Sequence, residues 1–150
     1  MPNRYDRYDW QSRIKAIERE YQAMRPAADR FQRAAQDDPT ILLEDLRHRE
    51  IVAASLHLEG TYFIRLFAEF ETGARSYRAT TRETHPRTLD LLNGLAARCG
   101  IPDTQRDLAH AAREYRNGLV HEREDDPEVI AIGQARHDLC HFFSYLPPEW

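Results

Sequence analysis

Lysine, cysteine and long apolar runs are scarce in this chain of 150 residues. A representative stretch of apolar and small residues, 51–56, is far shorter than the roughly 20 residues of a membrane-spanning helix, so we expect no membrane span. The first ten residues alternate charged and aromatic side chains and lack the apolar centre of a secretory signal. Two cysteines, Cys99 and Cys140, are too few for a disulfide framework and are expected to be buried thiols. These absences predict a cytoplasmic protein.

The formal net charge is −4, from 21 lysine and arginine residues against 25 aspartate and glutamate residues. This balance excludes a globally basic nucleic-acid-binding protein. The excess is local, because residues 122–128 (E-R-E-D-D-P-E) hold five acids and one arginine, and the rest of the chain is neutral. All basic side chains except Lys15 are arginines, and arginine is the better residue for bidentate contacts to phosphate.

Apolar residues recur at steps of three and four along most of the chain, which is the period of an amphipathic helix. The first helix is predicted to carry its apolar stripe from Trp10 to Ala35, with Pro26 inside it. Asp38 and Pro39 are residue types favoured at an N-cap and a first helical position. A second helix, the longest and the centre of the bundle, is therefore predicted from about Pro39 to about Arg78.

Three further helices are predicted. A short third helix runs from about Pro86 to Cys99, with Gly100 as its left-handed C-cap. A fourth begins near Pro102, and a fifth begins at Asp126-Pro127. The sequence therefore predicts a single all-α domain over residues 1–150, an up-and-down four-helix bundle with one additional short helix.

One segment, R-N-G-L-V-H at 116–121, places an arginine, an asparagine and a histidine where the fourth helix is expected to end. Residues five apart point about 140° away from each other on a helix. Arg116 and His121 therefore converge only if the helix ends between them, and Gly118 permits such an end. Leu119 and Val120 are then expected to enter the core and hold the turn.

The spacing alone has little specificity, because about one Arg-x4-His pair is expected by chance with this many arginines and histidines. A second pair, Arg136 and His141, lies in the middle of the fifth predicted helix, where nothing breaks the helix. We interpret that second pair as accidental.

R-N-G-L-V-H, at the end of the penultimate long helix of a small all-α bundle, resembles the signature of the HEPN superfamily. That signature is an arginine, a polar neighbour that is often asparagine, and a histidine four to six residues on. The segment L-E-G-T-Y-F-I-R-L-F-A-E-F-E at 58–71 is also similar to these proteins. The resemblance implies a four-helix bundle that dimerises with its motifs facing each other and acts as a metal-independent endoribonuclease. Many members are toxins or antiviral effectors, and others are inactive binding modules.

Carried onto this chain, the resemblance makes Arg116 and His121 the catalytic pair and Asn117 their polar support, with no metal or other cofactor. In the toxins that are paired with nucleotidyltransferases, the motif usually continues His-x-Tyr, and the antitoxin can nucleotidylate that tyrosine. Here Glu122 and Arg123 follow His121. Silencing through that tyrosine is therefore not predicted for this chain.

The residue types suit RNA cleavage by attack of the 2′-OH on the adjacent phosphate, which leaves a 2′,3′-cyclic phosphate and a 5′-OH. Histidine titrates near pH 6.5 and can take or give the proton, while arginine donates a fork of hydrogen bonds to phosphate oxygens. One histidine does not easily act as acid and base at once, and a two-fold homodimer would supply two. We expect a toxin or antiviral effector with RNA as substrate and an antitoxin or regulatory protein as a further partner.

Two alternatives stay open: a non-catalytic HEPN-like module that binds a nucleotide or a protein, and an unrelated helical adaptor. Arg75, Arg78 and Arg82 are candidate contacts to the RNA backbone, with a solvated helix end as the other interpretation. Several further residues are expected to lie on solvated helix faces, although the acids among them would also suit support of the cleft. They are Glu59, Glu69, Glu71, His137 and His141.

The acidic segment 122–128 directly follows His121. Acids beside a ribonuclease site oppose RNA, so we expect this segment to limit substrate access or to dock a basic partner. Neutralising Glu124, Asp125 and Asp126 should then raise RNA affinity or weaken partner binding, and an unchanged affinity for both would contradict this hypothesis.

Overall fold

The computed structural model describes residues 5–82, 84–121 and 127–150. The regular elements of this part of the chain are all helical, and the all-α prediction is confirmed. They are α1 (Arg7–Asp37), the 3₁₀ turn η1 (Pro39–Ile41), α2 (His48–Ala79), α3 (Thr88–Cys99), α4 (Asp103–Val120) and α5 (Ile132–Ser144). Among the described residues, no helix combines the length and apolar character needed to cross a membrane.

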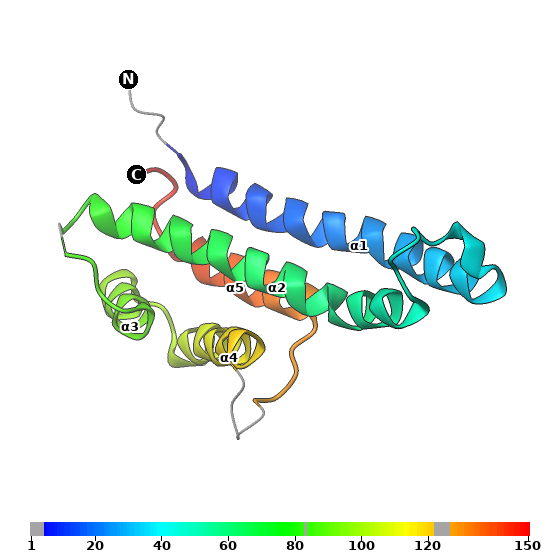
Figure 1. Ribbon diagram of the computed structural model, residues 1–150. Coiled ribbons are helices and arrows are strands. Elements are labelled where there is room, and N and C mark those ends of the chain that lie inside the picture. The colour runs from blue at the N-terminus through cyan, green and yellow to red at the C-terminus, as the bar shows by residue number, and fades with distance from the viewer. Residues whose placement is uncertain (1–4, 83, 122–126) are drawn as a thin grey trace.

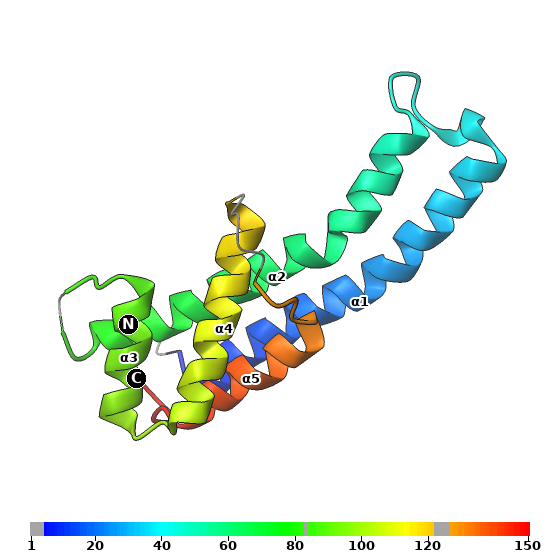
Figure 2. The ribbon, with the colours of Figure 1, turned by 90° about the horizontal axis from the view of Figure 1, so that it is seen from below.

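The helices α1 and α2 form a long antiparallel hairpin, and α5 packs against both (Figure 1). In that view α3 and α4 are seen nearly end-on, so they cross the hairpin steeply. Figure 2 shows that the far halves of α1 and α2 project beyond the other helices. We call residues 24–56 the arm and the remaining helical part the body.

The beginning of α1 is tied to the end of the chain. Asp6 and Asp9 form a reciprocal capping box. The backbone N–H of Arg7 donates to the carbonyl of Pro148 at 2.9 Å, and its guanidinium donates to the carbonyls of Ser144 and Leu146. Pro26 lies inside α1 without ending it. These contacts fix the start of α1 against the C-terminal turn.

The second helix begins at His48, so the prediction that it starts at Pro39 is wrong. Asp38 does cap a helical turn, since its carboxylate accepts from the N–H of Thr40 at 3.0 Å, but that turn is the short η1. The chain reverses direction between Asp37 and His48 to lay α2 antiparallel to α1, and α2 begins only after this connection.

The fifth helix begins at Ile132, so the predicted start at Asp126-Pro127 is also wrong. Asp126 lies outside the described residues, and Pro127 to Ala131 have no helical structure. The N–H of Ile132 donates to the Glu59 carboxylate of α2 at 3.0 Å. The N-terminus of α5 is therefore capped by another helix rather than by its own preceding residue.

The third helix begins at Thr88, two residues after the predicted start, and ends as predicted at Cys99. Gly100 has φ 64°, which confirms its role as a left-handed C-cap. Cys140 is buried as expected, whereas Cys99 is only partly buried. Burial raises the pKa of the Cys140 thiol.

The body core is built on aromatic rings of α2. Phe63, Phe67 and Phe70 are fully buried, and the Phe70 ring packs edge-on against Phe142 of α5 at a centroid distance of 5.4 Å. Gly73 lets α1 and α5 approach α2, because a Cβ at that position would lie 2.8 Å from atoms of the Trp10 and Phe143 rings. The Tyr115 ring of α4 packs edge-on against Phe63 at a centroid distance of 4.7 Å, which places α4 across α2 and thereby positions the candidate site.

Candidate functional site at the end of α4

The helix α4 continues through Gly118 and ends at Val120, directly before His121. The backbone of His121 is extended, and its N–H donates to the carbonyl of Asn117 at 2.9 Å. Leu119 and Val120 are 37% and 48% exposed. The prediction that these two residues enter the core is therefore wrong, although the end of the Leu119 side chain lies against Gly60 of α2.

Gly118 allows a close approach rather than a helix end. A Cβ at Gly118 would lie 2.7 Å from Cγ and 2.9 Å from Cδ of Pro127. The chain that returns toward α5 therefore packs directly on the last turn of α4. The sequence signal at this position is a glycine inside an otherwise regular helix. That glycine marks a close contact with another segment and not the helix end that the sequence predicts.

Arg116 projects from α4 onto α2. Its Nη2 donates to Oε2 of Glu71 at 3.4 Å, and its Cζ lies 5.1 Å from the centre of the Phe67 ring. Its Nε is buried without a hydrogen-bond partner among the described residues. The guanidinium is thus held between a carboxylate and an aromatic ring, with Nη1 donating to no described residue.

Glu71 organises the polar contacts around Arg116. Its Oε1 accepts from Thr88 Oγ1 and from Arg75 Nη2, both at 2.7 Å. Burial alone would raise the pKa of the Glu71 carboxyl, but hydrogen bonds from Thr88 and Arg75 and the charges of Arg75 and Arg116 hold it below its ordinary value. Glu71 is therefore ionised at neutral pH and orients Arg116.

The expectation that the three acids of α2 lie on solvated faces is wrong, because Glu59, Glu69 and Glu71 are each only partly exposed. For Glu71, the position four residues after Phe67 is a sequence signal that it lies on an enclosed face of α2. Glu59 accepts from the Tyr21 hydroxyl at 3.2 Å in addition to capping α5, and Glu69 pairs with Arg13 at 3.1 Å. All three acids connect α2 to another helix.

Arg116 and His121 lie at the same end of α4, but no hydrogen bond joins them, and His121 is exposed. Within one chain the structure therefore does not bring the two side chains into contact. The second Arg-x4-His pair is also separate, because Arg136 donates to Glu18 of α1 at 2.7 Å while His141 stacks on the Tyr145 ring.

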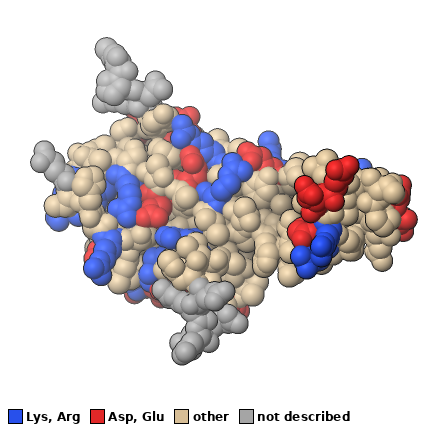
Figure 3. Space-filling view, in the orientation of Figure 1, with Lys and Arg blue, Asp and Glu red and all other residues tan. Residues whose placement is uncertain are grey.

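Arg75, Arg78 and Arg82 line one cavity of about 610 Å³ at the end of α2. Arg75 is engaged by Glu71 and by the carbonyl of Pro86, whereas Arg82 is exposed. On the face shown in Figure 3, Lys and Arg gather over the body, and Asp and Glu are prominent on the arm.

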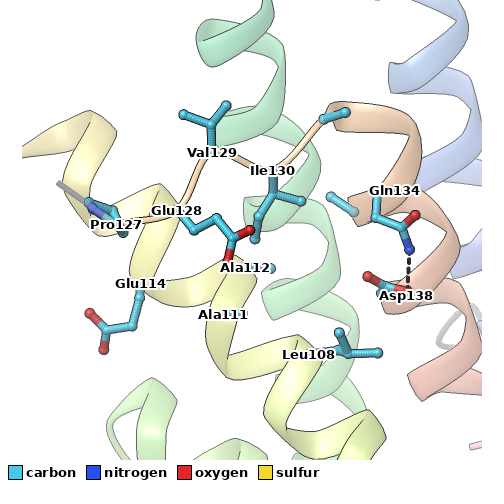
Figure 4. A pocket seen from close by; sticks show the side chains of 12 residues that line it. Leu108, Ala111, Ala112, Glu114, Pro127, Glu128, Val129, Ile130, Gln134 and Asp138 are labelled. Carbon is cyan, nitrogen blue, oxygen red and sulfur yellow. Dashed lines mark hydrogen bonds between the residues drawn. The ribbon is translucent and has the colours of Figure 1, made fainter.

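A second cavity of about 560 Å³ lies between α4, α5 and residues 127–131 (Figure 4). The ionisable side chains among its described lining residues are all carboxylates: Glu114, Glu128 and Asp138. Asp138 is buried and accepts from Gln134 Nε2 at 2.8 Å. This cavity therefore has the opposite charge character from the one at the end of α2, and it does not suit phosphate.

Of the acidic segment 122–128, residues 122–126 lie outside the described part of the chain, and Glu128 lines the carboxylate cavity. Within the described ranges, no group of three or more His, Cys, Asp or Glu side chains is placed to hold a metal ion.

Comparison of the chain with protein-family models, with curated proteins and with solved structures finds no match.

Proposed function

We propose that the protein is a homodimeric, metal-independent endoribonuclease of the HEPN type. Arg116 and His121 are its catalytic residues, and Asn117 is their polar support. The observation that carries the proposal is the end of α4, where a guanidinium held by Glu71 and Phe67 precedes an exposed histidine by little more than one helical turn. In this proposal α1, α2, α4 and α5 form the four-helix bundle, with α4 crossing the other three steeply, and α3 is the additional helix.

The contacts of Arg116 suit stabilisation of a phosphate. A guanidinium that is oriented before substrate arrives loses little free energy to reorganisation when charge develops on the phosphate. Glu71 and Phe67 supply that orientation, and Nη1 donates to no described residue. His121 would take the proton of the 2′-OH or give one to the leaving 5′-oxygen, which yields a 2′,3′-cyclic phosphate and a 5′-OH.

The surface beside His121 supports a dimer. Leu119 and Val120 are exposed next to it, and Leu119 packs at Gly60 of α2, where a Cβ would lie 3.2 Å from Leu119 Cδ2. Leu56, one turn before Gly60, is 76% exposed. A second copy that covers these residues across a two-fold axis would bring two arginines and two histidines into one cleft.

The family resemblance extends the proposal to biology. The enzyme acts in the cytoplasm as a toxin or antiviral defence effector, and an antitoxin or regulatory protein restrains it. Arg75, Arg78 and Arg82 contact the RNA backbone in this proposal.

The test is cleavage of varied RNAs in EDTA by the wild type, Arg116→Ala and His121→Ala. We expect each substitution to reduce cleavage at least about 100-fold, because each removes a group that acts in the transition state. The matched controls are Arg136→Ala and His141→Ala, which alter the second Arg-x4-His pair and should leave cleavage within about threefold. Analysis of the product ends should find 2′,3′-cyclic phosphate.

Undiminished cleavage in both Arg116→Ala and His121→Ala would contradict the catalytic assignment. No cleavage by any form would favour the non-catalytic module that binds a nucleotide or a protein. Light scattering that shows a monomer at the assay concentration would contradict the composite two-histidine site.

A further inference from the structure

The cavity at the end of α2 is a strongly basic hollow. Arg75, Arg78, Arg82 and His85 line it, together with hydroxyl side chains that include Thr84. None of its described lining residues is acidic. Its volume, about 610 Å³, falls in the range of small-molecule binding sites.

Arg75 builds the wall of this cavity. Its Nε and Nη2 donate to Oε1 of Glu71 at 3.1 and 2.7 Å, and its Nη1 donates to the carbonyl of Pro86 at 2.8 Å. These bonds neutralise its charge and attach the segment between α2 and α3 to α2. Arg75 therefore shapes the wall of the cavity, and little of its positive charge is available to a ligand.

Arg78 and Arg82 supply charge that no carboxylate of the described residues neutralises, since neither forms an ion pair there. Arg78 Nη2 donates to Thr84 Oγ1 at 3.1 Å, and its Nε is buried without a partner. Its Nη1 lies against α3, where a Cβ on Gly94 would approach it to 3.1 Å. The fold thus makes room for a partly buried guanidinium that forms no ion pair with any described residue.

The end of α2 would ordinarily repel an anion, because its last carbonyls carry partial negative charge. Here two of those carbonyls accept hydrogen bonds. The hydroxyls of Thr80 and Thr81 donate to the carbonyls of Tyr77 and Arg78 at 2.7 and 2.9 Å. This pairing reduces the repulsion that an anion would meet beside Arg78 and Arg82.

We infer that this cavity binds the terminal phosphate of a nucleotide. A phosphate monoester carries nearly two negative charges at neutral pH, which matches the two guanidinium groups that pair with no described carboxylate. Ala79 and Pro86 give the cavity apolar surface for the sugar or base. The phosphate belongs either to a free mononucleotide or to the end of an RNA strand. Only the second source rests on the proposed function.

The experiment is calorimetric titration of the full chain with AMP and with adenosine. We expect AMP to bind at least tenfold more tightly than adenosine, because the phosphate supplies the charge-assisted hydrogen bonds. Arg78→Gln and the exposed Arg82→Gln should each weaken AMP binding at least about fivefold. The matched control is Arg49→Gln, which removes an exposed arginine of the arm and should leave AMP binding unchanged.

Equal binding of AMP and adenosine, AMP binding that neither cavity substitution weakens, or the same loss in Arg49→Gln would overturn the inference. If AMP does not bind, the second probe is a tetradeoxynucleotide with a 5′-phosphate, compared with the same strand carrying a 5′-hydroxyl. Tighter binding of the phosphorylated strand would assign the phosphate to a strand end, and equal binding of the two strands would overturn the inference. These DNA oligonucleotides lack the 2′-OH and cannot be cleaved by the proposed reaction. Binding of AMP by an Arg116→Ala variant, without cleavage by any form, would contradict the proposed function and leave this inference standing.

Discussion

The body and the arm differ in what buries their apolar residues. In the body, three or more helices enclose rings such as Phe67, Phe70 and Phe142, which have no exposed surface. The arm has only two helices, and its large apolar side chains are mostly on the surface. The exposed ones are Met24, Phe31, Ile41, Leu43, Leu46, Val52 and Leu56.

Polar contacts hold the two helices of the arm together. Arg25 Nη1 donates to the carbonyl of Ser55 at 2.9 Å, its Nη2 pairs with Asp29 at 2.7 Å, and it also contacts the Ser55 hydroxyl. The same apolar period that builds the core of the body therefore leaves apolar side chains of the arm exposed to solvent, because no third helix among the described residues covers them. The period of a helix predicts an apolar face, but a neighbouring element is needed to bury it.

The largest expected effect follows from truncating one ring in each region. Phe70→Ala should lower the free energy of unfolding by about 3 to 5 kcal/mol, because it leaves a cavity among enclosed rings. Phe31→Ala, in the arm, should cost less than about 1 kcal/mol, since its ring is 42% exposed. Urea unfolding monitored by circular dichroism measures both.

Equal losses in the two variants would contradict the contrast between body and arm. A loss in Phe31→Ala that grows with protein concentration would sharpen it, because that result would show a second copy covering the arm.

A smaller effect is expected from adding a methyl group where helices touch. Gly73→Ala should destabilise the protein by about 1 to 3 kcal/mol, because the new Cβ would meet the buried Trp10 and Phe143 rings. Gly60→Ala is the control at the edge of the arm, where the new Cβ meets only the end of the Leu119 side chain. Thermal unfolding should leave Gly60→Ala at or above the wild-type Tm, and a larger loss there than at Gly73 would refute the packing argument.

The smallest effect is a pH dependence confined to the body. Burial lowers the pKa of His110, and the charges of Arg113 and Arg106 lower it further. Because the folded-state pKa lies below the unfolded value, the unfolded chain binds the proton more readily. The free energy of unfolding is therefore at its full value above about pH 6.5 and decreases as the pH falls below that value.

Replacing His110 with glutamine should remove this part of the pH dependence, which urea unfolding at pH 5 to 8 measures. The comparison at pH 8 is the control, because the histidine is then neutral in both states. An identical pH profile in His110→Gln would show that the partly buried imidazole contributes nothing to it.

How far the sequence predicts the fold depends on how local the interaction is. The extent of α1, the end of α3 and the left-handed Gly100 follow from residues within one or two helical turns. The predicted start of α2 is wrong because Asp38 and Pro39 begin a single 3₁₀ turn before the chain reverses. These residue types favour the start of a helix, but they do not determine how long that helix continues.

The candidate site shows the same division. Arg116, Asn117 and His121 were found as a short motif, and Arg75, Arg78 and Arg82 as a basic stretch. The Glu71–Arg75 pair is an i,i+4 contact that the sequence can predict, whereas the contact of Glu71 with Arg116 is not predictable because the two residues stand 45 apart. Gly118 stands out in the sequence as a glycine within a helix. The reason for it is tertiary, because Pro127, in the segment that leads to α5, packs against it.

The sequence by itself determined that this protein is helical and which faces of its helices are apolar, because hydrophobic period and caps act within a few residues. Only the tertiary structure decided that Glu71 holds Arg116, that Glu59 caps a helix 73 residues away, and that Arg78 and Arg82 line one cavity with no carboxylate among its described lining residues. Those contacts depend on how α3, α4 and α5 pack on α2, and that packing is set by side chains from several helices at once.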